Sequence, residues 1–125
     1  MTIHVDTSAL IDALTGPRRS LDTLIRLTAD GHRLQISAIV LYEWLRGPRS
    51  AGELAVQEEL FPSEGAVPFG PNEAAAAARL YRGMPRSRGR EIDLAVAACA
   101  LSAGAQLWTL NRSDFPDIAG LQLAD

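Results

Sequence analysis

The sequence predicts an α/β protein, a three-layer α/β/α sandwich with a mainly parallel central sheet. Short apolar runs alternate with longer segments of helical periodicity along the chain. Polar and acidic residues follow the ends of several of these runs, where parallel sheets form their sites. The chain has 125 residues and shows no repeat or linker, so we expect residues 1–125 to form one domain.

Each predicted element follows from its periodicity and from the turn residues that end it. The predicted strands are 2–5, 34–36, 66–69, 106–109 and 121–123. The predicted helices are 9–14, 20–29, 38–46, 51–60, 73–82 and 90–103. Asn72 is the expected N-cap of the alanine-rich fifth helix, with Glu73 in its first turn.

The composition excludes several classes of protein. No segment is apolar for the roughly 18 residues that a bilayer requires, and no secretory signal precedes Asp6. A single cysteine, Cys99, cannot form an internal disulfide, which favours a reducing compartment. We therefore expect a cytoplasmic protein that does not associate with a membrane. The net charge of -3 argues against a protein that coats nucleic acid.

All 12 basic residues are arginine, and five of them fall between Arg79 and Arg90. Arginine matches the geometry of phosphate, so this cluster could hold a phosphate backbone. It could also bind an acidic partner or form a solvated loop face. The expected substrate-binding residues are Arg86, Arg88, Arg90 and Arg112.

The most informative feature is a set of polar residues that are distant in sequence but occupy equivalent places in the α/β repeat. The set is Asp6, Glu43, Asp93, Asn111 and Asp114. Carboxylates that converge repel one another unless a divalent cation neutralises them, which points to a hard metal ion and phosphodiester chemistry.

Each member also has a structural interpretation. Asp6 could cap the helix that follows it. Asp93 could stabilise its own helix, because a negative charge in the first turn interacts favourably with the helix dipole. Glu43 lies in an apolar helix, where Arg46 could neutralise it. Asn111 and Asp114 could form turns in a loop. The histidines, His4 and His32, are expected to be structural or exposed.

Four segments resemble the motifs of PIN-domain nucleases, in order and spacing across the whole chain. They are 5–10 (VDTSAL), 37–43 (SAIVLYE), 88–98 (RGREIDLAVAA) and 109–115 (TLNRSDF). The chain length and the closing segment 115–123 look most like the VapC-type toxins of bacterial toxin–antitoxin pairs.

This resemblance implies that Asp6 and Asp93 bind Mg²⁺ or Mn²⁺ directly, and that Glu43 either binds the ion through water or orients the attacking water. The fourth motif holds Asn111 where the family often has aspartate, and Asp114 could compensate for the lost charge. Hydroxyls expected to support the metal ligands or contact phosphate are Thr7, Ser8, Ser37 and Thr109. The expected reaction is in-line hydrolysis that leaves a 5′-phosphate and a 3′-hydroxyl.

The resemblance further implies an RNA substrate, such as a tRNA or ribosomal RNA loop, together with a cognate antitoxin and a homodimer. The helical segments 39–45 and 54–61, with Trp44 and Phe61, carry ample apolar surface. That surface could face a partner or complete the monomer core, with equal weight.

Two rival functions are considered. A catalytically silent PIN-like RNA-binding or interaction module would explain Asn111 as decay of the site. A phosphatase or phosphotransfer domain would use Asp6 as a nucleophile, but Ser8 stands where its second aspartate is needed and the chain has no lysine. The sequence favours the nuclease.

Overall fold

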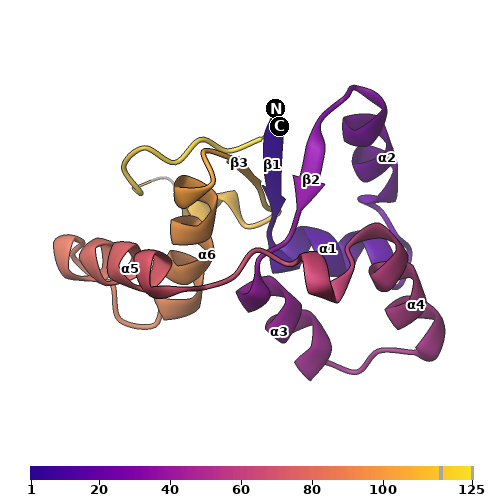
Figure 1. Cartoon of the computed structure of the whole chain (residues 1–125), viewed down its shortest axis with the longest axis horizontal. Coiled ribbons are helices and arrows are strands. Elements are labelled where there is room, and N and C mark those ends of the chain that lie inside the picture. Colours follow the sequence, from indigo (N-terminus) through magenta and orange to yellow (C-terminus); the bar gives the residue numbers. More distant parts are fainter. Residues whose placement is uncertain (116, 125) are drawn as a thin grey trace.

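The computed structural model describes residues 1–115 and 117–124. An open sheet of parallel strands lies at its centre (Figure 1). The strands are β1 (Thr2–Val5), β2 (Arg33–Gln35) and β3 (Gln106–Trp108). The α-helices are α1 (Thr7–Leu14), α2 (Leu21–Ala29), α3 (Ala38–Arg46), α4 (Ala51–Leu60), α5 (Pro71–Gly83) and α6 (Glu91–Ser102). Two short 3-10 helices are η1 (Ser63–Gly65) and η2 (Arg112–Asp114).

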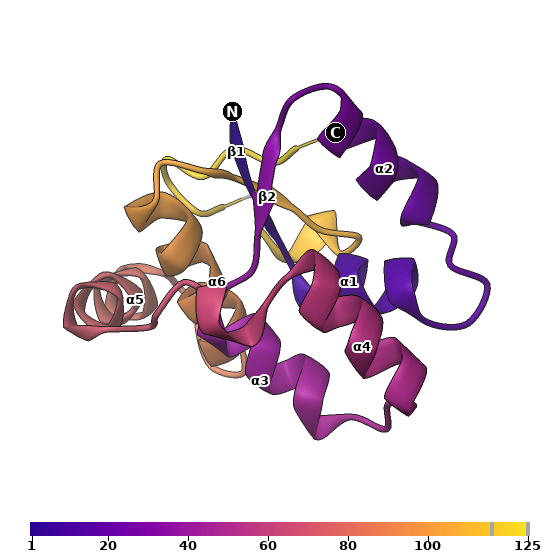
Figure 2. The same cartoon turned by 45° about the vertical axis from the view of Figure 1, so that its right-hand side comes forward.

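The sheet has the order β2-β1-β3, and both pairings are parallel. On the central strand, Ile3 lies opposite Leu34 of β2 and Gln106 of β3. Helices α5 and α6 lie on one side of the sheet, and α1, α2 and α4 lie on the other (Figures 1 and 2). The predicted layered α/β fold with a parallel sheet is therefore confirmed.

Helix α6 is the most buried helix. Every residue from Leu94 to Ala100 is buried, because α6 contacts β3 and α3 and is covered outside by α5. Helix α5 makes its main contacts with α6 and lies outermost on that side (Figure 2). Burial on most faces explains why the α6 segment is apolar with little periodicity.

His4 is a core residue in the middle of the sheet. Its side chain is fully buried, and its Nδ1 lies 3.2 Å from the amide nitrogen of Gln35 on β2. Burial lowers the pKa of His4 to about 4, so the ring is neutral near pH 7. Its position confirms the prediction of a structural histidine.

Two predicted strands, 66–69 and 121–123, are wrong: each contributes only an isolated bridge, Ser37 with Val67 and Leu107 with Leu123. The N–H of Val67 donates to the Ile36 carbonyl at 2.9 Å, but Pro68 follows and has no N–H to donate. The ladder therefore stops after one residue pair.

The predicted N-cap of α5 is also wrong. Helix α5 begins at Pro71, with Gly70 as its N-cap and Asn72 already inside the first turn. Proline favours the first helical position because its fixed φ suits the helix and no N–H is lost there. Glu73 accepts a hydrogen bond from the Gly70 N–H at 2.9 Å, which fixes this start. The other predicted element ends differ from the observed ones by at most two residues.

The apolar surface of α3 and α4 is divided between core and solvent. Trp44 and Phe61 are buried and complete the core, whereas Tyr42, Leu45 and Leu60 remain exposed. Of the two alternatives left open for Trp44 and Phe61, a partner surface or the monomer core, the structure therefore supports the core. No helix within residues 1–115 and 117–124 has the length and hydropathy needed to cross a bilayer.

Candidate active site

Polar side chains gather where the carboxyl ends of β1 and β3 meet. Asp6 directly follows β1, and its N–H continues the ladder by donating to the Trp108 carbonyl at 2.9 Å. Thr109 directly follows β3. The parallel register therefore places two residues 103 positions apart in direct contact.

The buried Asp6 carboxylate is held by two hydroxyl groups. Its Oδ2 accepts a hydrogen bond from Ser8 Oγ at 2.9 Å and another from Thr109 Oγ1 at 2.8 Å. Asp6 stands at the N-cap position of α1, but none of the described backbone N–H groups of that helix donates to its side chain. The interpretation of Asp6 as a side-chain cap is therefore wrong.

The same two hydroxyls also fix the segment after β3. Ser8 Oγ accepts a hydrogen bond from the Leu110 N–H at 3.0 Å, and Thr109 Oγ1 accepts one from the Asn111 N–H at 3.0 Å. Thr109 is buried, whereas the side chain of Asn111 is exposed at the surface. The junction of β1 with α1 and the start of the 109–111 segment therefore form one hydrogen-bonded unit.

Helix α3 brings Glu43 to this unit. The fully buried Ser37 caps α3 by accepting a hydrogen bond from the Val40 N–H at 3.2 Å. Glu43 follows within the same helix, and its Oε1 accepts a hydrogen bond from Thr7 Oγ1 at 2.6 Å. Ser37 therefore supports the site through the position of α3, and its buried hydroxyl is not presented to a ligand.

The structural interpretation of Glu43 is present as well. Its Oε2 lies 3.2 Å from Nη2 of Arg46, one turn further along α3. The Arg46 side chain is 54% exposed, and an exposed pair of this kind contributes only about 0–1 kcal/mol. Glu43 is therefore shared between an ordinary surface ion pair and the hydroxyl of Thr7 at the site.

Asp93 lies within reach of the charges of the other acids. It lies in the first turn of α6, half-buried, and its pKa is raised from the ordinary 3.8 to about 6. Burial is the main cause, followed by the negative charges of Asp114, Asp6 and Glu43, while Arg90 opposes the shift. The charges of Asp114, Asp6 and Glu43, which come from three other segments, therefore add to the effect of burial on Asp93.

These side chains fit a hard divalent cation. The raised pKa of Asp93 marks a local excess of negative charge that a cation would relieve. In the described part of the chain, no three acidic, histidine or cysteine side chains approach closely enough to enclose an ion by themselves. Mg²⁺ commonly takes only one or two carboxylates and completes its coordination with several waters, so a closed cage of three acids is not required for it.

The predicted phosphate-binding arginines differ in how they are engaged. Arg86 and Arg88 are exposed on the loop before α6. Arg112 Nη1 donates to the Ala124 carbonyl at 2.8 Å, which ties η2 to the C-terminal segment. Arg90 donates from both Nη1 and Nη2 to Asp117, at 3.1 Å each. Arg86 and Arg88 are thus the more available of the four.

An open hollow of about 940 Å³ lies beside Asp93. Its lining combines acids with arginines: Pro85, Arg86, Gly89, Arg90, Asp93, Ser113, Asp114 and Asp117. Asp117 was not predicted from the sequence as a site residue. The only signal available was a carboxylate in the loop after the fourth acidic segment, and its partner Arg90 is 27 positions away.

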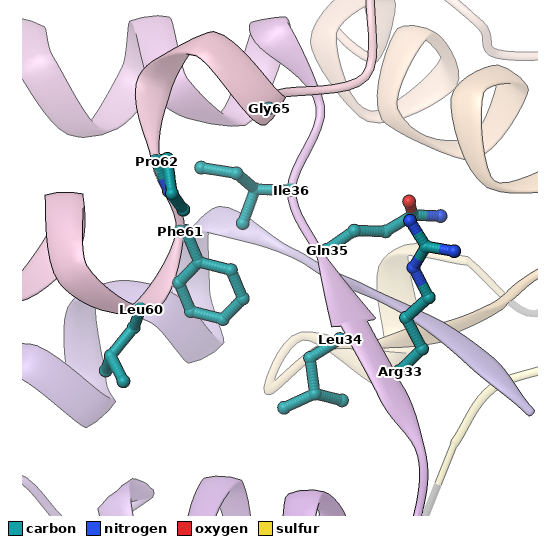
Figure 3. Close-up of a pocket in the computed structure, with 8 residues that line it drawn as sticks. All are labelled: Arg33, Leu34, Gln35, Ile36, Leu60, Phe61, Pro62 and Gly65. Carbon is teal, nitrogen blue, oxygen red and sulfur yellow. The ribbon is translucent and has the colours of Figure 1, made fainter.

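A second, smaller cavity of about 120 Å³ lies beside β2, away from the acids (Figure 3). Leu34, Ile36 and Phe61 lie on one side of the strand there, and Arg33 and Gln35 extend on the other. The residues that line this cavity include no carboxylate, imidazole or thiol. It therefore offers no chemistry comparable to that of the acidic edge.

Comparison with known proteins gives a consistent result. Residues 3–121 match the PIN domain family. Ribonuclease VapC19 of Mycobacterium tuberculosis is 32% identical over 120 residues, which cover 94% of this chain and 95% of that protein. Among solved structures, DNA-bound VapBC from Salmonella typhimurium has a TM-score of 0.76 at 22% identity, covering 100% of this chain and 98% of that chain. VapBC2 from Rickettsia felis, bound to a DNA fragment from their promoter, has a TM-score of 0.75 at 20% identity, covering 99% and 98%.

Proposed function

The chain belongs to the PIN-domain family and is a VapC-type ribonuclease toxin, and from that premise we propose that Asp6 and Asp93 hold Mg²⁺ or Mn²⁺ for RNA hydrolysis. The observation that supports this proposal is the buried Asp6 carboxylate, which Ser8 and Thr109 hold at the carboxyl end of the sheet. The pKa of Asp93 is raised by burial and by the negative charges of Asp114, Asp6 and Glu43, which also favours a bound cation. When bound, a divalent ion offsets the charge of the scissile phosphate and lowers the pKa of a water molecule.

The chain's own residues then have separate tasks. Ser8 and Thr109 hold the Asp6 carboxylate in one orientation, and Thr7 does the same for Glu43. Glu43 orients the attacking water for in-line displacement. Asp93 must lose its proton to bind a cation, so we expect metal affinity to rise with pH through the region of its pKa, about 6.

The fourth motif supplies negative charge through Asp114. Asn111 is neutral, and its contact with the site is a backbone hydrogen bond to Thr109. Asp114 carries the charge that acts on Asp93, and it lines the hollow together with Ser113. We assign the role of the fourth acid to Asp114 on this ground, with Asn111 contacting substrate through its exposed amide.

The hollow beside Asp93 suits a phosphate backbone. Arg86 and Arg90 line it, and Arg88 lies exposed on the same loop. Because the acids sit at an open edge, single-stranded RNA, such as a tRNA or ribosomal RNA loop, is the substrate class that can reach them. The arginines bind the phosphates on either side of the bond that is cut.

We also assign an antitoxin partner and a homodimer to the chain in a cytoplasmic setting. Tyr42 and Leu45 on α3 and Leu60 on α4 are exposed apolar side chains of the kind that protein partners cover. The buried, unpaired Cys99 suits a reducing compartment. An antitoxin that covers the acidic edge would keep the toxin inactive.

The test is cleavage of labelled single-stranded and structured RNAs in Mn²⁺, in Mg²⁺ and in EDTA. We expect cutting in either metal, none in EDTA, and a loss of at least about 100-fold in rate for Asp6→Asn and for Asp93→Asn. Asp30→Asn, which removes an exposed acid between α2 and the amino end of β2, is the control and should retain the wild-type rate.

Cleavage that persists in EDTA would overturn the metal-dependent mechanism. A folded wild-type protein that neither binds Mn²⁺ nor cuts RNA would favour the silent interaction module instead. Calorimetric titration of Mn²⁺ into the wild type and into Asp93→Asn separates these outcomes from a wrong choice of RNA.

A further inference from the structure

Among the residues that the structure describes, Arg90 is the predicted substrate-binding arginine that pairs with an acid in the hollow beside Asp93. Its Nη1 and Nη2 each lie 3.1 Å from a different oxygen of the Asp117 carboxylate. Nη2 also donates to the carbonyl of Asp114. Two parallel bonds from a guanidinium to a carboxylate use the same geometry by which arginine binds a phosphate.

The pair lies beside the reacting groups. Arg90 directly precedes α6, three residues before Asp93, and its charge acts on both Asp93 and Asp114. Arg90, Asp93, Asp114 and Asp117 line the same hollow of about 940 Å³. A phosphate held there by Arg90 would lie next to the proposed metal ligands.

The Asp117 carboxylate can readily be replaced by another anion on Arg90. The Asp117 side chain is 53% exposed and the Arg90 side chain 21% exposed, so water can solvate both groups after they separate. Exposed ion pairs contribute little to stability, because water competes with the Coulomb attraction. A phosphate of similar shape and equal or greater charge can therefore take the place of the carboxylate.

We propose that Asp117 is an internal competitor for the RNA phosphate site of Arg90. Its carboxylate occupies the guanidinium in the free protein and leaves it when an RNA phosphate enters the hollow. This inference rests on the proposed function, because it assumes that RNA reaches the acidic edge. It adds a residue that weakens RNA binding and so sets how readily the toxin engages its substrate.

The test measures the dissociation constant of a fluorescein-labelled single-stranded RNA by anisotropy at low ionic strength in EDTA. Asp117→Asn keeps the side-chain shape and removes the competing charge, so we expect RNA to bind about 2- to 5-fold more tightly. Asp30→Asn changes the net charge equally, but between α2 and the amino end of β2, and should shift the dissociation constant by less than about 1.5-fold.

A double-mutant cycle shows whether Asp117 acts through Arg90. Arg90→Gln alone should weaken binding, and Asp117→Asn added to it should give no further gain over the control. If Asp117→Asn weakened RNA binding, or lowered both RNA binding and the melting temperature, the Arg90–Asp117 pair would serve to stabilise the fold and not to compete with RNA. A gain that persisted without Arg90, a gain no larger than that of Asp30→Asn, or no measurable RNA binding would also overturn the proposal.

The two proposals fail in different ways. Wild type that binds RNA but does not cut it in Mn²⁺ would overturn the nuclease mechanism and leave the Asp117 result standing. Metal-dependent cutting together with unchanged binding by Asp117→Asn would overturn the competitor alone.

Discussion

Thr109 is the residue on which the geometry of Asp6 depends. Its hydroxyl donates to the buried Asp6 carboxylate at 2.8 Å and accepts from the Asn111 N–H at 3.0 Å. A buried carboxylate is tolerated only when hydrogen bonds replace the lost water. Ser8 supplies the second such bond at 2.9 Å, so the two hydroxyls share this task.

We expect Thr109→Val, which keeps the side-chain shape, to lower the free energy of unfolding by about 1–3 kcal/mol. The hydrogen bond to the charged Asp6 is lost, and the Asn111 N–H loses its acceptor. RNA cleavage should fall as well, because Asp6 is less firmly oriented. Urea unfolding and single-turnover cleavage measure the two effects.

Thr28→Val is the matched control for this substitution. The Thr28 hydroxyl donates to the Leu24 carbonyl within α2, and the residue is exposed. Its substitution should change stability by no more than about 0.5 kcal/mol and leave cleavage unchanged. Equal losses in the two variants would mean that the hydrogen bonds of Thr109 at Asp6 contribute no more to stability or cleavage than an ordinary exposed hydroxyl does.

At the scale of elements, two capped helices of similar length serve different purposes. Ser37 caps α3, which carries Glu43 to the site. Ser50 caps α4, where Ser50 and Glu53 form a reciprocal capping box with bonds of 3.1 and 2.8 Å. Helix α4 contributes no residue to the acidic edge, so its cap concerns folding alone.

We expect Ser37→Ala and Ser50→Ala each to lower the free energy of unfolding by about 1 kcal/mol. Only Ser37→Ala should also slow RNA cleavage, because fraying of α3 displaces Glu43 from Thr7. Cleavage under conditions where both variants are fully folded separates the two effects. Equal cleavage rates would show that the position of Glu43 does not depend on the Ser37 cap.

At the scale of the whole molecule, the fold brings like charges together at the expense of stability. The raised pKa of Asp93 means that its ionised form is disfavoured in the folded chain relative to the unfolded one. The resulting loss of stability is fully present above about pH 6. It disappears as the pH falls through 6 towards 3.8, because Asp93 is then protonated in the folded and the unfolded chain. Sites that bind cations commonly carry such a penalty until the ion is bound.

We expect Asp93→Asn in EDTA at pH 7 to raise the free energy of unfolding by about 1–2 kcal/mol, a value reduced for solvent screening. The gain should vanish near pH 4, where wild-type Asp93 is protonated. Mn²⁺ at about 100 times its dissociation constant should stabilise the wild type by about 2.7 kcal/mol. The wild type should then be more stable than Asp93→Asn. Thermal unfolding with and without Mn²⁺ checks both statements.

A different pattern would contradict this electrostatic account. Lower stability of Asp93→Asn in EDTA would mean that Asp93 makes favourable contacts that outweigh the repulsion. Equal stabilisation of both proteins by Mn²⁺ would place the ion elsewhere.

Much of the architecture could be predicted from local patterns. The apolar runs at 2–5 and 106–109, which alternate with segments of helical periodicity, were enough to predict the parallel α/β fold. The pairing of residues 66–69 could not be predicted, because strand length depends on an available partner edge and on the missing N–H of Pro68. Likewise, apolar composition alone could not tell the buried Trp44 from the exposed Tyr42 on the same helix.

By itself, the sequence determined which residues carry chemistry and in what order, since strand ends, helix periodicity and acidic motifs are local properties of the chain. Only the tertiary structure decided what those residues touch. The Asp6 side chain is held by hydroxyl groups and makes no capping bond to α1, Glu43 contacts both Thr7 and Arg46, and Arg90 is paired with Asp117. The physical reason is distance along the chain, because the parallel register and the packing of α6 set which groups 27 to 103 positions apart come into contact.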